Sequence, residues 1–174
     1  MRRALGLFVL ACSPALLAGC NDTNSPAANA KVSMQDKCDP ATFNAGIGPG
    51  TCTGSGTVTL SAFNNELNAT HRVAAWQFVP AALTIHVGQA ITAVNDGGEV
   101  HTFTEVAQFG GGEVPSLNSA SGTPNEAPEC KQLTAADHVA AGASFTTDVA
   151  TTAETELYQC CIHPWMHAVV TVTP

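Results

Sequence analysis

Residues 155–173 read TELYQCCIHPWMHAVVTVT. The first seven and the last six residues of this stretch are rich in β-branched and aromatic side chains and predict two strands. The loop between them carries a thiolate, an imidazole and a thioether at the spacing Cys160-x2-His163-x2-Met166. Because a strand that runs into a tight loop can turn all three side chains toward one point, we expect a ligand site at one end of a sheet.

The rest of the chain repeats the pattern of short apolar and polar alternation. Segments of this kind occur at 57–63, 72–78, 82–87, 90–95, 100–106 and 143–149. With turn residues such as Asn95-Asp96-Gly97-Gly98 between them and no convincing helix, they predict an all-β fold, a Greek-key β-sandwich or barrel of about eight strands. The exception is a long 107–142 insertion, and such a loop in a compact domain is usually functional or loosely ordered.

Composition limits the class of protein. The chain has 174 residues, of which 45% are hydrophobic and 11% charged, so it has the length of one ordinary domain and is too apolar to be wholly disordered. Its formal net charge is −8. A charge this negative argues against nucleic acid as a partner and favours a cationic one.

The first residues form a targeting signal. A basic pair, Arg2 and Arg3, precedes an apolar run too short to span a bilayer, and the run ends in Leu17-Ala18-Gly19-Cys20. This order resembles a bacterial lipoprotein signal over 1–19, with Cys20 as the lipidated residue; the alternative is an ordinary secretory peptide. We therefore expect an exported, lipid-anchored protein at the periplasmic face of the outer membrane or at the cell surface.

The division of the mature chain follows from its polarity. Residues 21–37 have almost no large apolar side chains and predict a flexible tether. We expect the lipid anchor, the tether and a small Cys-containing segment over 20–56, and one β-domain over 57–174. The anchor would be the protein's only connection to a membrane.

The candidate ligands come from two places. His101 follows a Gly-rich turn, far upstream of Cys160, His163 and Met166. Two imidazoles and one thiolate with a weak axial Met are the ligand set of a mononuclear blue-copper site, which holds both Cu(II) and Cu(I). A zinc site would more often show a second Cys or a carboxylate in place of Met. The other histidines are interpreted as structural or solvated, with His167 a candidate for the rim of the site.

These residues resemble the cupredoxins, most closely the amicyanin and plastocyanin branch. The segment Phe78-Val79-Pro80, the short Cys-x2-His-Pro-x-Met loop and the closing strand at 169–172 are similar to that family in order and spacing, and the resemblance covers roughly 57–174. It implies one type 1 copper held by His101, Cys160, His163 and Met166. The sequence departs from the family at Cys161, at Thr102 and in the length of 107–142.

The resemblance implies a one-electron carrier rather than an enzyme, since oxidases and nitrite reductases need further coppers and a second domain. His163 would be the exit ligand, inside an exposed apolar docking patch with Pro164 and Trp165. The expected partner of this monomer is a transient redox protein, for which a cationic c-type cytochrome or an oxidase is the candidate. The alternative is a copper-binding protein for storage, delivery or sensing.

The remaining cysteines predict disulfides. With Cys12 removed in the leader, Cys20 lipidated and Cys160 on copper, four are left: Cys38, Cys52, Cys130 and Cys161. Three connectivities are open. We favour Cys38–Cys52, which closes a short loop poor in apolar residues, and Cys130–Cys161, because neighbouring strand residues point to opposite faces and Cys161 must face away from Cys160. The alternative is that one pair stays reduced.

Overall fold

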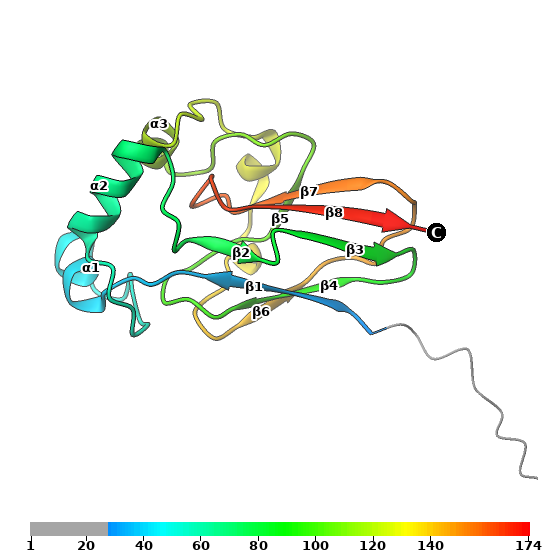
Figure 1. Cartoon of the computed structure of the whole chain (residues 1–174), viewed down its shortest axis with the longest axis horizontal. Helices are drawn as coiled ribbons and strands as arrows, with labels where there is room; N and C mark the ends of the chain where they lie inside the picture. Colours follow the sequence, from blue (N-terminus) through cyan, green and yellow to red (C-terminus); the bar gives the residue numbers. More distant parts are fainter. Residues whose placement is uncertain (1–27) are drawn as a thin grey trace, which may run out of the picture.

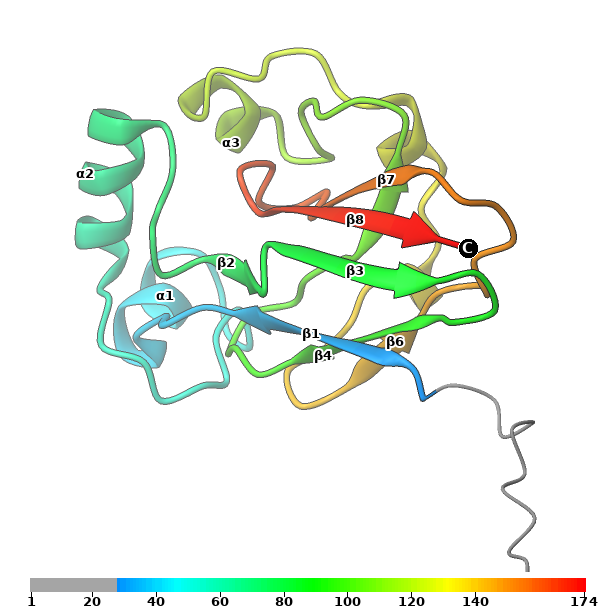
Figure 2. The same ribbon diagram turned by 45° about the vertical axis from the view of Figure 1, so that its right-hand side comes forward.

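Two four-stranded sheets lie face to face in the computed structural model, which describes residues 28–174 (Figures 1 and 2). The first sheet has the order β2 (Gln77–Val79), β1 (Ala30–Gln35), β4 (Ile91–Asn95) and β6 (Ser144–Thr146). The second has the order β3 (Ala82–His86), β8 (His167–Thr173), β7 (Thr155–Gln159) and β5 (Thr104–Val106). The predicted signal, with Cys12 and Cys20, lies outside the described residues.

Alternating side chains explain how the sheets meet. On β8 the residues Ala168, Val170 and Val172 are buried, whereas Val169 between them is exposed. On β4 the buried residues Ile91 and Ala93 alternate with half-buried ones in the same way. β1 pairs with β4 and β3 pairs with β8 in parallel, while the other neighbours are antiparallel. The predicted all-β sandwich of about eight strands is confirmed.

One strand was missed, because the prediction of a flexible tether is wrong for residues 30–35. These residues form β1, which lies between β2 and β4 in the first sheet. The signal was the alternation around Val32 and Met34, both fully buried in the core. The folded domain therefore begins well before residue 57.

The strand predicted at 57–63 is also wrong. The chain instead forms α2 (Leu60–Thr70), whose N-cap is Thr59, with α1 (Pro40–Gly46) before it. The Thr59 side chain accepts a hydrogen bond from the Ala62 N–H, and Phe63 and Leu67, one turn apart, bury a single face. The helical spacing of these two residues outweighs the short alternation that suggested a strand.

Two further predicted strands are mostly loop. Within 72–78 only the residues of β2 pair with a neighbouring strand, and within 100–106 only those of β5 do so. His101 sits in irregular backbone and makes an isolated bridge with Val139. These irregular stretches let Trp76 and His101 turn into the interior beneath the two helices.

The 107–142 segment is confirmed as a long connection without strands. It contains α3 (Pro115–Ala120) and the two 3-10 turns η1 (Pro128–Gln132) and η2 (Ala135–Asp137). In Figure 1 its helix α3 lies at the same end of the sandwich as α1 and α2, where the β7–β8 loop also turns. Within residues 28–174 no helix has the length and apolar character needed to cross a bilayer.

Candidate metal centre

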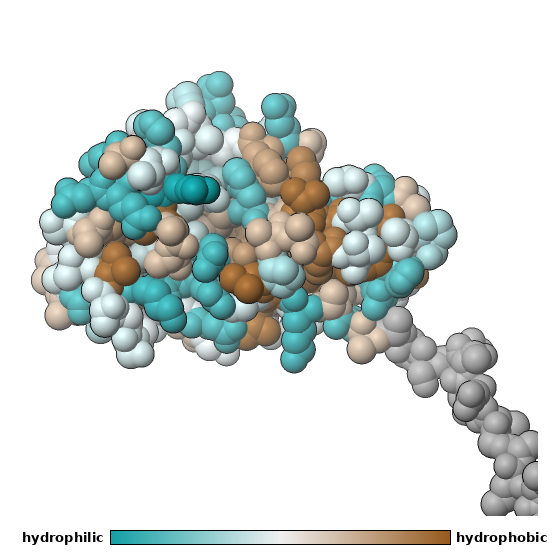
Figure 3. Space-filling view, in the orientation of Figure 1, coloured by the Kyte–Doolittle hydropathy of each residue, from teal (hydrophilic) through white to brown (hydrophobic). Residues whose placement is uncertain are grey.

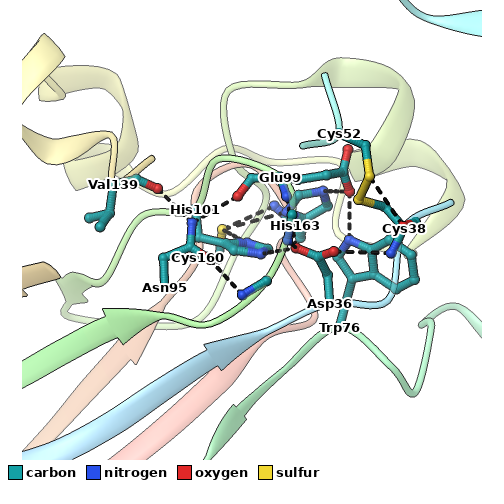
Figure 4. A network of polar contacts seen from close by, with 12 residues as sticks. Asp36, Cys38, Cys52, Trp76, Asn95, Glu99, His101, Val139, Cys160 and His163 are labelled. Atoms are coloured by element: carbon teal, nitrogen blue, oxygen red, sulfur yellow. Dashed lines mark hydrogen bonds and ion pairs between the residues drawn. A yellow bond between two sulfur atoms is a disulfide. The ribbon is translucent and has the colours of Figure 1, made fainter. Parts of the chain in front are cut away.

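Three predicted ligands converge at this helix-covered end of the sandwich (Figure 4). The Cys160 Sγ lies 3.8 Å from the Nδ1 atom of His101 and 3.8 Å from the Nδ1 atom of His163. The ligand atoms of all three residues lie within 4.8 Å of one another. His101 and Cys160 are completely buried and His163 is 3% exposed, so the three donors face a dry interior.

The spacing of these donors fits a first-row metal ion. Metal–nitrogen and metal–sulfur bonds of about 2.0–2.3 Å, arranged trigonally, place donor atoms roughly 3.5–4 Å apart. Both sulfur–nitrogen separations fall in that range. Cys160 is also the one free cysteine among residues 28–174, so its sulfur is left for a metal while the other cysteines there are paired.

The Cys160 sulfur is fixed from several sides. It accepts hydrogen bonds from the backbone N–H groups of Thr102 and His163, each at 3.4 Å. The Thr102 hydroxyl in turn accepts a hydrogen bond from the Cys161 N–H at 2.8 Å. Thr102, one of the positions where the sequence departs from the family, therefore joins the region of the first histidine to the ligand loop.

The ligand loop itself is closed by backbone hydrogen bonds. The Cys160 N–H donates to the Met166 carbonyl at 3.0 Å, and the Met166 N–H donates to the His163 carbonyl at 2.9 Å. Met166 is fully buried in the same hydrophobic cluster as Cys160. Met166 is thus held in the same tight loop as Cys160 and His163.

Sequence reasoning missed Asp36, which lies directly behind His101. The His101 Nε2 atom is 2.9 Å from the Asp36 Oδ2 atom, and both side chains are buried. Backbone N–H groups of Cys38, Gly98 and Glu99 also donate to this carboxylate. A β-carbon at Gly97 would collide with the carboxylate, so the glycine lets the loop close around Asp36.

A second missed carboxylate, Glu99, lies behind His163. The His163 Nε2 atom is 3.5 Å from the Glu99 Oε2 atom, which accepts a hydrogen bond from the Trp76 indole at 2.7 Å. Glu99 is 7% exposed. Asn95 holds the same loop by donating to the Glu99 carbonyl at 2.8 Å. Each converging imidazole therefore has a buried carboxylate on its far nitrogen (Figure 4).

Comparison with known proteins gives remote structural matches. A purple cupredoxin from Nitrosopumilus maritimus is 18% identical, with a TM-score of 0.46, and the match covers 83% of this chain and 100% of that chain. Oxidized plastocyanin from Dryopteris crassirhizoma is 17% identical, with a TM-score of 0.42 and the same coverage. A reduced Cu(I) form of an amicyanin mutant is 20% identical, with a TM-score of 0.40, over 59% of this chain and 78% of that chain.

No family model matches the chain, and no curated protein matches it either. The three solved structures given above are a cupredoxin, a plastocyanin and an amicyanin, in agreement with the sequence resemblance. Their identities and TM-scores are too low to carry a functional argument. The case for the site rests on its donor atoms.

Burial and the neighbouring charges shift the pKa values of the converging side chains in opposite directions. Burial raises the pKa of the Cys160 thiol, but contacts with His101 and His163 outweigh it and hold this pKa well below its usual range. Burial lowers the pKa of His163, but Cys160 and Glu99 outweigh it and raise the pKa to about 10. Burial also raises the pKa of Asp36, and hydrogen bonds from His101 and the backbone overcome it and keep the pKa low.

The predicted exposed patch around His163 is wrong in part. Pro164 is buried and so is His163, because Trp76 lies over the histidine with ring centroids 6.4 Å apart. Trp76 in turn stacks on Phe43 of α1 at 5.8 Å. Trp165 is half-buried, 5.6 Å from the His163 ring. Trp76, which packs on Phe43 of α1, therefore shields the expected exit ligand from solvent.

The structure contains the two predicted disulfides, Cys38–Cys52 and Cys130–Cys161. The second joins the ligand loop to the 107–142 segment, and its two cysteines lie in a small hydrophobic cluster apart from the main core. The first lies beside Asp36, whose carboxylate accepts from the Cys38 N–H. Both bridges therefore brace chain segments that carry or support the converging side chains.

Proposed function

We propose that this protein is a one-electron carrier with a single type 1 copper held by His101, Cys160 and His163, with Met166 as a weak axial ligand. The observation that carries the proposal is the buried triangle of two Nδ1 atoms and one sulfur. Copper in such a ligand set alternates between Cu(II) and Cu(I). The surrounding fold would keep the donors in place in both states, because backbone hydrogen bonds fix the Cys160 sulfur and close its loop.

Burial of the ligands favours a carrier over a copper store or chaperone. Handing a metal to another protein requires donor atoms that an acceptor can reach, whereas Cys160 and His101 are completely inaccessible. The alternative function would require the side chains packed around these donors, such as Trp76 beside His163, to move aside. A competition assay separates the two: copper that leaves slowly to a strong Cu(I) chelator supports the carrier, and rapid transfer supports delivery.

Trp165 is the proposed point of electron exchange. It lines a groove of about 480 Å³ with Trp76 and Met166, and its ring is close to that of His163. A redox partner seated on this groove would approach the ligands more closely than one at the sheet faces. We expect the partner to be a transient and cationic redox protein, given the net charge of −8.

An oxidising location agrees with the two disulfides, which form and persist in exported proteins. We propose that the protein is exported and anchored through lipid on Cys20 at the periplasmic face of the outer membrane or at the cell surface. Mass spectrometry of the membrane fraction tests this directly. An acylated N-terminal peptide starting at Cys20 is expected, and an unmodified mature N-terminus would overturn it.

The decisive experiment is a copper titration of the purified protein. One equivalent of Cu(II) should give an intense visible absorption from thiolate-to-copper charge transfer, which one electron equivalent of reductant removes and reoxidation restores. A colourless protein at one equivalent of copper, or a protein that retains zinc in preference to copper, would overturn the proposal.

A further inference from the structure

Both ligand imidazoles are backed by buried carboxylates on the nitrogen that faces away from the Cys160 sulfur. Asp36 Oδ2 lies 2.9 Å from the Nε2 atom of His101, and Glu99 Oε2 lies 3.5 Å from that of His163. Neither carboxylate belongs to the Cys160-x2-His163-x2-Met166 motif. Asp36 follows β1, which was expected to be a tether, and Glu99 lies in the turn after β4.

The two carboxylates are held independently of the imidazoles. Asp36 is fastened by the N–H groups of Cys38, Gly98 and Glu99, at 2.8–3.0 Å. Glu99 is fastened by the Trp76 indole at 2.7 Å. Since these donors belong to fixed backbone and to a fully buried ring, neither carboxylate is free to swing away.

A carboxylate on the far nitrogen of a ligand histidine has two physical consequences. It accepts the Nε2–H, which fixes the tautomer and ring orientation and leaves Nδ1 free to bind a metal. It also places negative charge near the ion in a dry interior, where Coulomb interactions are strong. That charge stabilises the more positive Cu(II) state more than Cu(I).

We propose that Asp36 and Glu99 are positioning residues that hold the two ligand imidazoles through Nε2 and lower the reduction potential of the copper site. This inference rests on the proposed copper function. One electron enters or leaves at the metal, and the carboxylates neither gain nor lose a bond in the step. Asp36, from the segment after β1, and Glu99, from the turn after β4, thereby tune the site from two parts of the chain.

The test compares Asp36→Asn and Glu99→Gln with the control Asp96→Asn in copper-loaded protein. Asp96 is exposed and lies in the same turn, where it accepts from the Ser33 hydroxyl at 2.6 Å rather than from an imidazole. At a fixed solution potential, each of the first two variants should shift the Cu(II)/Cu(I) ratio at least tenfold toward Cu(I). For a one-electron couple this corresponds to a rise of about 59 mV in the reduction potential. The control should shift it by much less.

A competition titration gives a second readout. Cu(II) affinity should fall about 10–100-fold in Asp36→Asn and Glu99→Gln, as is typical when the partner of a ligand histidine is removed, and Cu(I) affinity should fall less. Glu99→Asp, which keeps the charge, should recover part of the loss. If Asp36→Asn does not fold, Glu99→Gln still decides whether a carboxylate behind a ligand imidazole lowers the potential, because Gln can accept the Trp76 N–H.

The outcomes separate the two proposals. A wild-type protein that gives no coloured Cu(II) form overturns the copper function, and this inference with it. A coloured wild type whose Glu99→Gln and Asp36→Asn variants match Asp96→Asn in potential and affinity overturns this inference alone. A shift in only one of the two variants overturns the role of the other carboxylate.

Discussion

Cys160 and Cys161 are neighbours in the chain but belong to two different hydrophobic clusters. Cys160 lies in the main core beside the converging imidazoles, whereas Cys161 lies in a smaller cluster with Cys130. The two cysteines directly follow β7, and their side chains lie on opposite sides of the chain, as alternation along an extended backbone predicts. One cysteine is therefore left for a metal while the next braces the loop from behind.

This separation predicts different outcomes for the two sulfurs. Cys160→Ser should abolish the visible absorption of the copper-loaded protein. The double variant Cys130→Ser/Cys161→Ser should keep it and lose about 2–4 kcal/mol of unfolding free energy, since a disulfide constrains the unfolded chain. Copper titration and denaturant melts measure the two effects. Colour that survives in Cys160→Ser but disappears in the double variant would reverse the ligand assignment.

The ligand motif could be predicted from sequence because its spacing is local. Cys160, His163 and Met166 lie within seven residues, and a short loop after a strand suffices to bring them together. His101 could also be predicted as a ligand, because it lies between a Gly-rich turn and a strand pattern. Alternation along one strand also indicated that Cys161 faces away from Cys160, which favoured its pairing with Cys130.

The carboxylates could not be found in this way. Asp36 reaches His101 only because β1 pairs in parallel with β4, a contact between segments about sixty residues apart. Parallel neighbours leave no turn signature in the sequence, and Asp36 lies in a polar stretch typical of a tether. The burial of His163 beside Trp76 was missed because Phe43 and Phe63, which pack on Trp76, were placed outside the expected domain and on a strand, respectively.

The axial position is tested by Met166→Leu. A thioether binds copper weakly, so its loss should leave copper bound, and it should raise the reduction potential because Cu(II) depends on the extra donor more than Cu(I) does. Voltammetry measures the shift. The control is Met34→Leu, an equally buried methionine on β1, which should cost below ~1.5 kcal/mol of stability and leave the potential unchanged. Equal potentials in both variants would mean that Met166 serves only in packing.

The groove beside the site is tested by Trp165→Lys. Trp165 is half-buried near the rings of His163 and Phe63, so the variant should lose some stability while the visible spectrum stays largely intact. Electron transfer to cationic cytochrome c should slow at least several-fold in stopped-flow measurements, and high salt should slow the wild type too. Val149→Lys, at an exposed site, adds the same charge as a control. Equal rates in the two variants would place electron exchange elsewhere.

The edge of the second sheet carries a cluster of acidic residues around Glu105. Removing the charge of Glu105 should stabilise the protein, by an amount that depends on pH. Burial, and then repulsion from Glu156, Glu154 and Glu129, raises the pKa of Glu105. A carboxyl group whose pKa is raised on folding opposes folding above its folded pKa, and the penalty disappears below the pKa of the unfolded chain, about 4.3 for Glu. Glu105→Gln should therefore stabilise the protein at pH 7 by less than about 1 kcal/mol, because Glu105 is exposed, so that water screens the repulsion, and lies opposite Tyr158 rather than another carboxylate. The gain should fade as the pH drops toward 4.

Thermal melts between pH 4 and pH 7 measure this gain in stability, with Glu126→Gln as a control for net charge. A gain that persists at pH 4, or one that the control reproduces, would show that repulsion within this cluster is not its cause.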